Sequence, residues 1–301
     1  MNELKANNIE RTNNIERTKD VEITNNIEIT NNRERSIGET VEIEDLINDF
    51  CQRPEVESIA LGGSRALNIN DANSDYDIYV YLSNDLLLEV RKEILQKYCK
   101  YMEINNQYWE MEDDCTLHNG IVIEIIYRTI DDLRKSVKNV VDDANASNGY
   151  TTCIWNNLLE CKILYDSNHR LQQLKEQYAM SYPDKLRYNI IKKNLELLDG
   201  YIPSYSQQIE KALERRDIIS INHRITEFLA SYFDIIFAIN KQTHPGEKRL
   251  IQLCQKKCEK LPQDFSSNLE KLLTVNSDKE QVMKIVMEIV NNVKELVQKE
   301  V

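Results

Sequence analysis

Three acidic side chains stand at spacings that could do chemistry. Asp75 and Asp77 lie two residues apart in the segment DYDIYVYL, and Glu124 lies inside the apolar segment GIVIEIIYR. Side chains alternate between the two faces of a β-strand, so Asp75 and Asp77 share a face, and Glu124 points away from Ile123 and Ile125. Like charges held this close repel each other, and a fold tolerates them chiefly where a cation bridges them. Three such carboxylates suit Mg²⁺, which prefers oxygen ligands.

A glycine pair precedes these acids at the end of an expected strand. The chain has only seven glycines, yet Gly62 and Gly63 are adjacent and are followed by Ser64. Residues without a Cβ let backbone N–H groups approach a ligand closely, and the serine adds a hydroxyl. This pattern predicts a phosphate cradle. A simple tight turn is the alternative, because the spacing is neither that of a Walker loop nor GxGxxG.

The combination of these motifs resembles a known superfamily. The segment ALGGSRALNINDANSDYDIYVYL, followed by VIEII, is similar to the nucleotidyltransferase superfamily typified by DNA polymerase β, over roughly residues 56–128. That superfamily carries a Gly-Gly/Ser turn, an Asp-apolar-Asp pair and a third acid on a later strand. Within it, the chain resembles small bacterial enzymes that adenylylate aminoglycosides or lincosamides. The segment 233–250 resembles the helical domain of a less characterised bacterial branch.

The resemblance implies a role for each matching residue. It assigns the Gly62, Gly63 and Ser64 turn to nucleotide binding, with ATP or another nucleoside triphosphate as substrate. It assigns Asp75, Asp77 and Glu124 to catalysis and to two Mg²⁺ ions. A glutamate at the third position has a longer arm than an aspartate, so Glu124 either completes the metal shell or acts as general base.

Two basic residues are further candidates for nucleotide binding. Lys248, in HPGEKRL, is expected to open a new helix at the edge of the helical part, where it would meet the β and γ phosphates; a solvated helix charge is the alternative. Arg65 directly follows the glycine-serine turn. It either contacts phosphate or pairs with Asp71 or Glu57.

An aromatic and acidic cluster suggests a site for the acceptor. Trp109, Glu110 and Glu112, with Asp113 and Asp114, precede the last expected strand. One interpretation is a pocket that stacks on and neutralises a cationic sugar. The other is a solvated hairpin.

The periodicity of the sequence predicts an α+β fold, in which a mixed β-sheet with helices, of the nucleotidyltransferase type, is followed by an all-α helical bundle. An amphipathic helix is expected in VEIEDLINDFCQR and another over 85–98, and DDCTLHNG is expected to be a turn. No strand is expected after Asp131. Strands are expected at 56–63, 75–82, 101–111 and 120–128.

The chain is expected to divide into three parts. Residues 1–36 are low-complexity repeats of six (NNIERT and variants), with too little apolar surface to offset the entropy of ordering, so they are predicted to be disordered. A self-association element is the alternative. Residues 37–145 are the expected catalytic domain, and residues 146–301 the expected helical bundle domain.

Charge and composition limit the partners. The net charge is −12, with −14 over residues 37–166 and +3 over residues 167–301. An acidic catalytic half argues against nucleic acid as a partner. The chain has no run of eighteen apolar residues and no secretory signal, so we expect no membrane span and a cytoplasmic location. Seven cysteines without a C-x-x-C pair suggest reduced core thiols.

The leading hypothesis is an Mg²⁺-dependent nucleotidyltransferase. It would transfer a nucleoside monophosphate, with AMP as the expected group, to a hydroxyl of a small molecule and release pyrophosphate. An aminoglycoside- or lincosamide-like acceptor would make it an antibiotic resistance enzyme. The alternative is an AMPylating enzyme of toxin–antitoxin type that modifies a protein. A regulatory module without turnover is disfavoured, because all three acids are intact.

Overall fold

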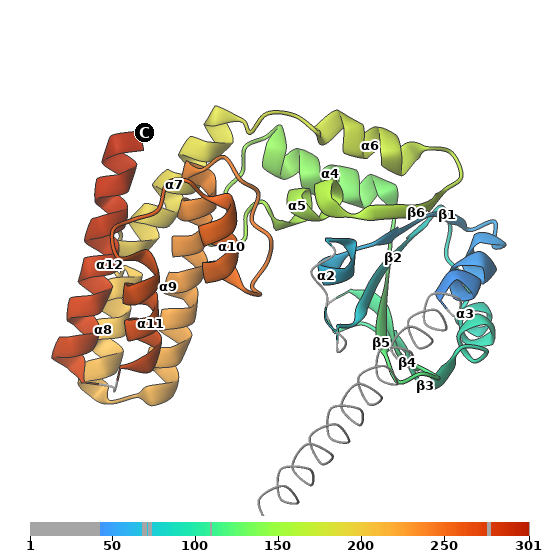
Figure 1. The fold of residues 1–301 in the computed structure, drawn as a ribbon, viewed down its shortest axis with the longest axis horizontal. Helices are drawn as coiled ribbons and strands as arrows, with labels where there is room; N and C mark the ends of the chain where they lie inside the picture. Colours follow the sequence, from blue (N-terminus) through green and yellow to red (C-terminus); the bar gives the residue numbers. More distant parts are fainter. Residues whose placement is uncertain (1–42, 68–70, 72–73, 109, 276–277, 301) are drawn as a thin grey trace, which may run out of the picture.

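The structure is a computed structural model of the 301-residue chain, and it describes residues 43–67, 71, 74–108, 110–275 and 278–300. The predicted repeats at 1–36 and Trp109 lie outside the described residues. A mixed β-sheet with helices forms one part of the molecule, and a bundle of helices stands beside it (Figure 1). The predicted α+β class is therefore confirmed.

Six strands form the sheet, in the order β3-β4-β5-β2-β1-β6. β2 and β5 run parallel, and all other neighbours are antiparallel. The strands are β1 (Val56–Leu61), β2 (Tyr76–Leu82), β3 (Cys99–Asn106), β4 (Met111–Leu117), β5 (Val122–Arg128) and β6 (Lys162–Asp166).

Alternation along the strands gives the sheet two different faces. Tyr76, Ile78 and Val80 of β2 pack into a core with a helix at 43–51 and with α3 (Leu88–Leu95). Tyr79 and Tyr81 point to the opposite face. There they pack with the second core, to which α4 (Ile130–Val141), α5 (Cys153–Glu160) and α6 (Arg170–Tyr178) contribute. Asp75 and Asp77 share this second face.

The expected turn at DDCTLHNG is wrong, because its first half is strand β4. Asp113 lies on the core face of β4 and is fully buried. Its carboxylate accepts hydrogen bonds from Arg91 of α3 (2.8 Å), the Tyr127 hydroxyl (2.8 Å) and the Asn105 backbone N–H (2.7 Å). Because these partners come from three other elements, the sequence of β4 alone does not show that Asp113 is buried. Its polar residues therefore predicted a turn.

The expectation that no strand follows Asp131 is also wrong. β6 pairs with β1 at the edge of the sheet, and the Ser58 hydroxyl donates to the Asp166 carboxylate at 2.7 Å. Only five residues long, β6 directly follows α5, so the helical pattern of the segment masked it. The predicted domain boundary at residue 145 stays a prediction. One strand of the sheet, β6, comes from beyond that residue.

The second part of the molecule consists of helices packed around α9, whose C-terminal half is almost entirely buried. α10 lies on the side of this bundle that faces the sheet (Figure 1). None of the described helices is both long and apolar enough to cross a membrane. The helices are α7 (Asp184–Asp199), α8 (Tyr205–Arg215), α9 (Ile218–Ile239), α10 (Leu250–Lys257), α11 (Phe265–Thr274) and α12 (Lys279–Glu300).

A buried polar network ties the segment before α5 to the bundle. Asn194 of α7 accepts from the Gly149 backbone N–H at 3.1 Å. Asp234 of α9 accepts from the Thr151 backbone N–H (3.1 Å) and hydroxyl (2.6 Å), and from the Asn194 amide (3.2 Å). Burial raises the pKa of Asp234 to about 7, although these three donors oppose the shift. The connection between the two parts is thus held by hydrogen bonds rather than left as a free linker.

The seven cysteines are all free, as predicted. Five of them are buried and fill core positions: Cys99, Cys115, Cys161, Cys254 and Cys258.

Candidate active site

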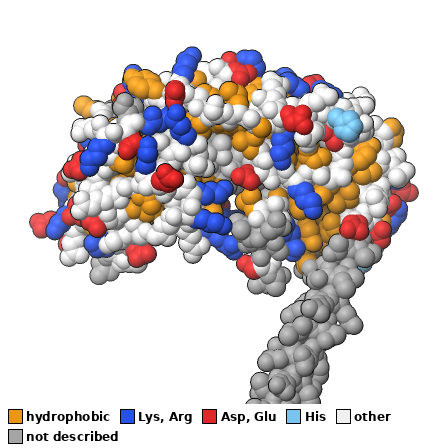
Figure 2. All heavy atoms as spheres, turned by 45° about the horizontal axis from the view of Figure 1, so that its top comes forward, with side chains coloured by type: hydrophobic (Ala, Val, Ile, Leu, Met, Phe, Trp, Pro, Cys, Tyr) orange, Lys and Arg blue, Asp and Glu red, His pale blue; other side chains and the backbone are white. Residues whose placement is uncertain are grey.

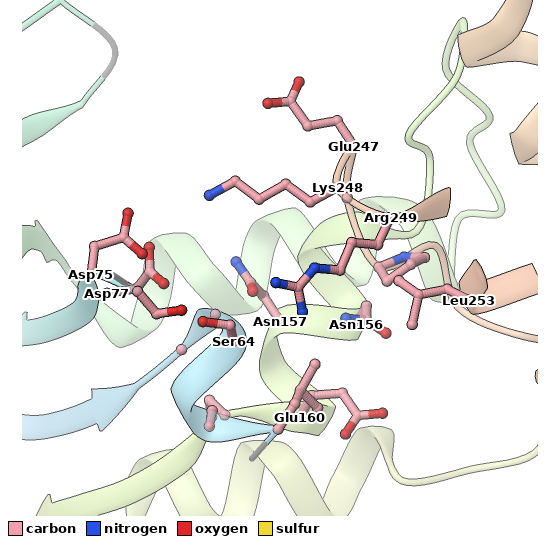
Figure 3. A pocket seen from close by; sticks show the side chains of 18 of the residues that line it. Ser64, Asp75, Asp77, Asn156, Asn157, Glu160, Glu247, Lys248, Arg249 and Leu253 are labelled. Atoms are coloured by element: carbon pink, nitrogen blue, oxygen red, sulfur yellow. The ribbon is translucent and has the colours of Figure 1, made fainter. Parts of the chain in front are cut away.

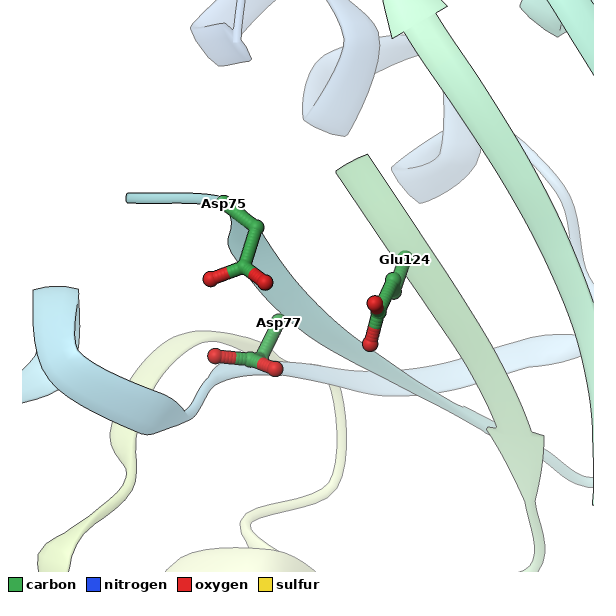
Figure 4. Close-up of side chains that lie close together, drawn as sticks. All are labelled: Asp75, Asp77 and Glu124. Carbon is green, nitrogen blue, oxygen red and sulfur yellow. The ribbon is translucent and has the colours of Figure 1, made fainter. Parts of the chain in front are cut away.

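The three predicted carboxylates meet on one face of the sheet. Asp77 of β2 lies directly beside Glu124 of β5 in the parallel pairing, and Asp75 stands just before β2. One oxygen from each carboxylate lies within 4.8 Å of the others, and all three residues are half-buried (Figure 4). Within the described residues, no other cluster of three or more ligand-type side chains is this close.

Mutual repulsion marks this cluster as a place for a cation. Burial and the Asp75 charge raise the pKa of Asp77, and Lys248 opposes the shift. Burial raises the pKa of Glu124, and the charges of Asp77, Asp75 and Asp114 add to it. A divalent ion would remove this cost, and the all-oxygen donor set is the one that Mg²⁺ prefers.

The glycine turn lies against the same carboxylates. Gly63 begins the short helix α2 (Gly63–Ala66) with φ +58°, and a Cβ on it would stand 1.6 Å from Oδ2 of Asp77. A Cβ on Gly62 would stand 2.5 Å from the Tyr79 ring. The Gly62 backbone N–H donates to the Asp77 carbonyl at 2.8 Å. The glycine pair therefore forms a tight turn and also lets the backbone pass close to Asp77 and Tyr79. The role of Ser64 in phosphate binding stays a prediction.

A cavity of about 540 Å³ opens beside the carboxylates (Figure 3). The glycine turn, Asp75 and Asp77 form one wall. The turn at 245–249, just before α10, forms the opposite wall, from which the Lys248 ammonium points toward Asp75 and Asp77. Lys248 therefore precedes a helix at the edge of the bundle, as predicted. Glu124, beside Asp77 on β5, is not among the lining residues.

Arg65 positions the start of β2. Its guanidinium Nε donates to the carbonyls of Ser74 (3.1 Å) and Asp75 (3.0 Å), and Nη2 donates to Ser74 at 2.7 Å. The guanidinium also lies 3.9 Å over the Tyr76 ring centroid. These contacts fix the backbone that carries the first aspartate, and direct phosphate contact by Arg65 stays a prediction.

The two acids expected as alternative partners of Arg65 form ion pairs with other arginines. Asp71 pairs with Arg249 at 3.2 Å, and Glu57 pairs with Arg170 at 2.9 Å. The first of these pairs joins the loop after α2 to the turn before α10, so it crosses the cavity.

The predicted acceptor residues lie on and beside β4. Glu110 pairs with Arg128, which lowers the pKa of Glu110, and the Arg128 guanidinium stacks 4.6 Å over the Tyr79 ring centroid. Glu112 is half-buried, and burial, Asp114 and Glu110 raise its pKa. Trp109 lies outside the described residues. Two of the three predicted residues thus stand on the edge of the same face as the carboxylate cluster.

Several residues around the site gave no signal in the sequence. Asn156, Asn157 and Glu160 of α5 line the cavity, and Arg249 does so from the opposite wall. The Asn157 amide donates to the Tyr79 hydroxyl at 3.1 Å, which links α5 to β2. Residues brought together from separate elements have no common spacing, so only the fold could reveal them. Asp114, which the sequence placed in a turn, lies beside Glu124 on the neighbouring strand.

The first part of the chain matches the model of a known domain family. Residues 43–146 match the family model described as "Nucleotidyltransferase domain", and residues 152–250 match one described as "Domain of unknown function (DUF4037)". The chain thus carries a nucleotidyltransferase domain, as the resemblance to the DNA polymerase β type implied. It is an enzyme of the class that transfers nucleoside monophosphates.

Three solved structures that match the chain share 13% sequence identity with it. The alignment with a nucleotidyltransferase-like protein from Exiguobacterium sibiricum covers 84% of this chain and 72% of that protein's chain, with a TM-score of 0.42. An aminoglycoside 6-adenyltransferase from Bacillus subtilis covers 85% and 89% (TM-score 0.31). A CCA-adding enzyme from Thermotoga maritima, complexed with tRNA, covers 88% and 82% (TM-score 0.31). A search among curated proteins gave no match.

Proposed function

We propose that the chain is an Mg²⁺-dependent nucleotidyltransferase that transfers AMP from ATP to a hydroxyl group of a small cationic molecule and releases pyrophosphate. One observation carries this proposal. The oxygens of Asp75, Asp77 and Glu124 lie within 4.8 Å of one another at the edge of a 540 Å³ cavity, and the opposite wall of that cavity presents Lys248.

The residues of the site divide the work between the two substrates. Asp75, Asp77 and Glu124 would hold two Mg²⁺ ions, which neutralise charge on the transferring phosphate and orient the substrates. The Gly63 and Ser64 turn would bind the triphosphate from the sheet side, and Lys248 from the bundle side.

The reaction forms one bond to phosphorus and breaks another. The acceptor hydroxyl oxygen attacks the α-phosphorus, and the bond from that phosphorus to the oxygen bridging the α and β phosphates breaks. Pyrophosphate leaves, and the hydroxyl proton passes to Glu124 and then to water. One observation supports this role for Glu124: unlike Asp75 and Asp77, it does not line the cavity that Lys248 faces.

The face of β3 and β4 beside Glu124 supports a cationic acceptor. Cross-strand pairing places Glu103 next to Asp114, and Asp114 next to Glu124. The exposed Tyr101 ring lies on the same face, and its hydroxyl donates to Glu103 at 2.6 Å. A hydroxylated amine such as an amino sugar matches this combination of carboxylates and an aromatic ring. An antibiotic acceptor would make the reaction one of resistance.

One assay tests the proposal and its main alternative. Pyrophosphate release is measured with each of the four nucleoside triphosphates and Mg²⁺, against a panel of aminoglycosides, lincosamides and neutral sugars, with Asp75→Asn as the inactive control. We expect release with ATP and an amino sugar, and a product heavier by one AMP in the mass spectrum. Labelled protein in a lysate without a small-molecule product would favour protein AMPylation. Extension of an RNA or DNA end would overturn the argument from charge.

A further inference from the structure

One histidine is buried directly beneath the turn that carries Lys248. His244 is 0% exposed, and its ring centroid lies 5.0 Å from that of Tyr150 and 4.8 Å from that of Phe237. Its Nδ1 accepts the Gly246 backbone N–H at 3.2 Å and lies 3.4 Å from Sγ of Cys153. The imidazole therefore joins the turn at 245–249 to the first residue of α5.

The chemistry of this ring indicates why a histidine stands there. Burial lowers the pKa of His244 to about 4, so the ring is neutral, with its proton on Nε2 because Nδ1 accepts. Nε2 is buried and has no hydrogen-bond partner among the described residues. A phenylalanine would fill the same space without leaving a buried donor unpaired. The feature that a phenylalanine lacks is the acceptor at Nδ1.

The turn also needs an anchor because its backbone is strained. Arg249, at the end of the turn, has a Cβ and φ +58° in the left-handed region, whereas Gly246 adopts its φ of +106° without strain. A residue in that region persists only when its surroundings hold it there. The hydrogen bonds of His244 and of Thr243 hold the start of this turn.

α5 extends this anchor to the metal side of the cavity. The Thr152 hydroxyl accepts the His244 backbone N–H at 2.8 Å, and the Thr243 hydroxyl donates to the Asn156 side chain at 2.7 Å. One residue further along α5, Asn157 donates to Tyr79, which stands two residues after Asp77 on β2. These hydrogen bonds, together with the backbone of α5, thus connect the turn to the strand that carries the aspartates.

We propose that His244 is a positioning residue, which uses Nδ1 to hold the 245–249 turn so that Lys248 and Arg249 meet the triphosphate opposite Asp77. Arg249 supports this reading because it lines the same cavity and its guanidinium already bridges the cavity to Asp71. The inference rests on the proposed nucleotide-binding role of this cavity. It explains how the turn at 245–249 is kept in place opposite the glycine turn and Asp77.

The test separates the acceptor atom from the packing of the ring. His244→Phe keeps a slightly larger aromatic ring at this position and removes Nδ1, whereas His244→Asn places an amide oxygen near the former position of Nδ1. We expect His244→Phe to raise the KM for ATP, and the Kd of a non-hydrolysable ATP analogue with Mg²⁺, by about tenfold, the effect of losing one hydrogen bond. The kcat at saturating ATP should stay within about twofold. His244→Asn should restore part of the affinity, and His223→Phe, at an exposed position of α9, should change neither constant.

Two further variants keep every outcome decisive. Lys248→Ala should also weaken nucleotide binding, and His244→Leu, which also lacks Nδ1, replaces His244→Phe if that variant does not fold. Should Lys248→Ala bind nucleotide weakly while the folded His244→Phe or His244→Leu variant binds normally, His244 serves packing alone and this inference is wrong. Normal binding by Lys248→Ala would overturn the nucleotide role of the turn, and this inference with it.

Discussion

Asp77 is the residue on which most of the site geometry converges. Its side chain lies beside Glu124, its Oδ2 occupies the space that a Cβ on Gly63 would need, and its carbonyl holds the Gly62 N–H. Strand periodicity was enough to predict that it shares a face with Asp75. The contact with the glycine turn joins residues fourteen positions apart through a loop, and only the structure reveals it.

Replacing this carboxylate should separate activity from stability. Asp77→Asn removes a metal ligand, so we expect turnover to fall by at least about 100-fold, which corresponds to several kcal/mol of lost transition-state stabilisation. In metal-free buffer its melting temperature should equal or exceed that of the wild type, because a repulsive half-buried charge is gone. Mg²⁺ should raise the melting temperature of the wild type but not of the variant.

Asp85→Asn, at an exposed loop position, is the matched control and should behave as the wild type in both assays. Near-normal turnover by Asp77→Asn would refute the metal assignment.

Gly63 offers a second test at the same scale. Gly63→Ala would place a methyl group 1.6 Å from Oδ2 of Asp77, so we expect activity to be lost through displacement of that carboxylate. Gly120→Ala has a similar positive φ (+97°), but its Cβ would lie 3.5 Å from the end of the Lys100 side chain. Gly120→Ala should lose about 1–2 kcal/mol of stability from backbone strain, and Gly63→Ala should lose more because the clash with Asp77 adds to the strain. Urea unfolding measures both losses, and only Gly63→Ala should lose turnover. Equal activity in the two would show that the close approach is unimportant.

Among the elements, β4 was hidden by its polar residues. Three acidic residues follow one another at its start, because Asp113 on the core side is paired with Arg91 while Glu112 and Asp114 face outward. Hydrophobic alternation therefore gave no strand signal. β1, β2 and β5 were predicted correctly since their core faces are apolar.

Substitution of the two neighbouring aspartates of β4 should change stability by very different amounts. Asp113→Asn leaves the buried Arg91 guanidinium without its counter-ion, and breaking a buried pair costs about 3–5 kcal/mol. Asp114→Asn lies on the other face, where it would relieve repulsion with Glu124, so its stability should stay within about 0.5 kcal/mol of the wild type. Urea unfolding of both variants checks this. Similar losses in the two would mean that the register of β4 is wrong.

At the scale of the whole molecule, the two parts meet around a cavity and a buried carboxylate. Figure 2 shows a hollow near the middle of the molecule, bordered by Lys and Arg side chains. The division into an α+β part and a helical part could be predicted from periodicity. The contacts between the parts could not, because Asp234 and Thr151 are 83 residues apart and each looks ordinary in its own segment.

Asp234 should make stability depend on pH. Its pKa of about 7 lies above the ordinary value of 3.8, so the folded protein keeps a proton that the unfolded chain releases between about pH 4 and 7. This group therefore lowers the free energy of unfolding as pH rises through that range. Asp234→Asn does not titrate, and its stability relative to the wild type should increase from pH 5 to pH 8, by at most about 3 kcal/mol.

Urea unfolding of the wild type, Asp234→Asn and Asp85→Asn at each pH measures the difference. A constant difference between Asp234→Asn and the wild type would mean that Asp234 is ionised throughout the range.

The place of β6 has a consequence for how the chain can be cut and how it folds. All six residues of β1 are buried, and β1 lies between β2 and β6. A fragment that ends at residue 146, where the match to the nucleotidyltransferase domain ends, would lack β6. β1 would then be an exposed edge strand with unpaired backbone N–H and C=O groups, which favours aggregation. During synthesis, the catalytic sheet stays open until residue 166 has left the ribosome. A fragment extended through α6, to residue 178, should be the shortest piece from this end that stays in solution, and comparing the solubility of the two fragments checks it.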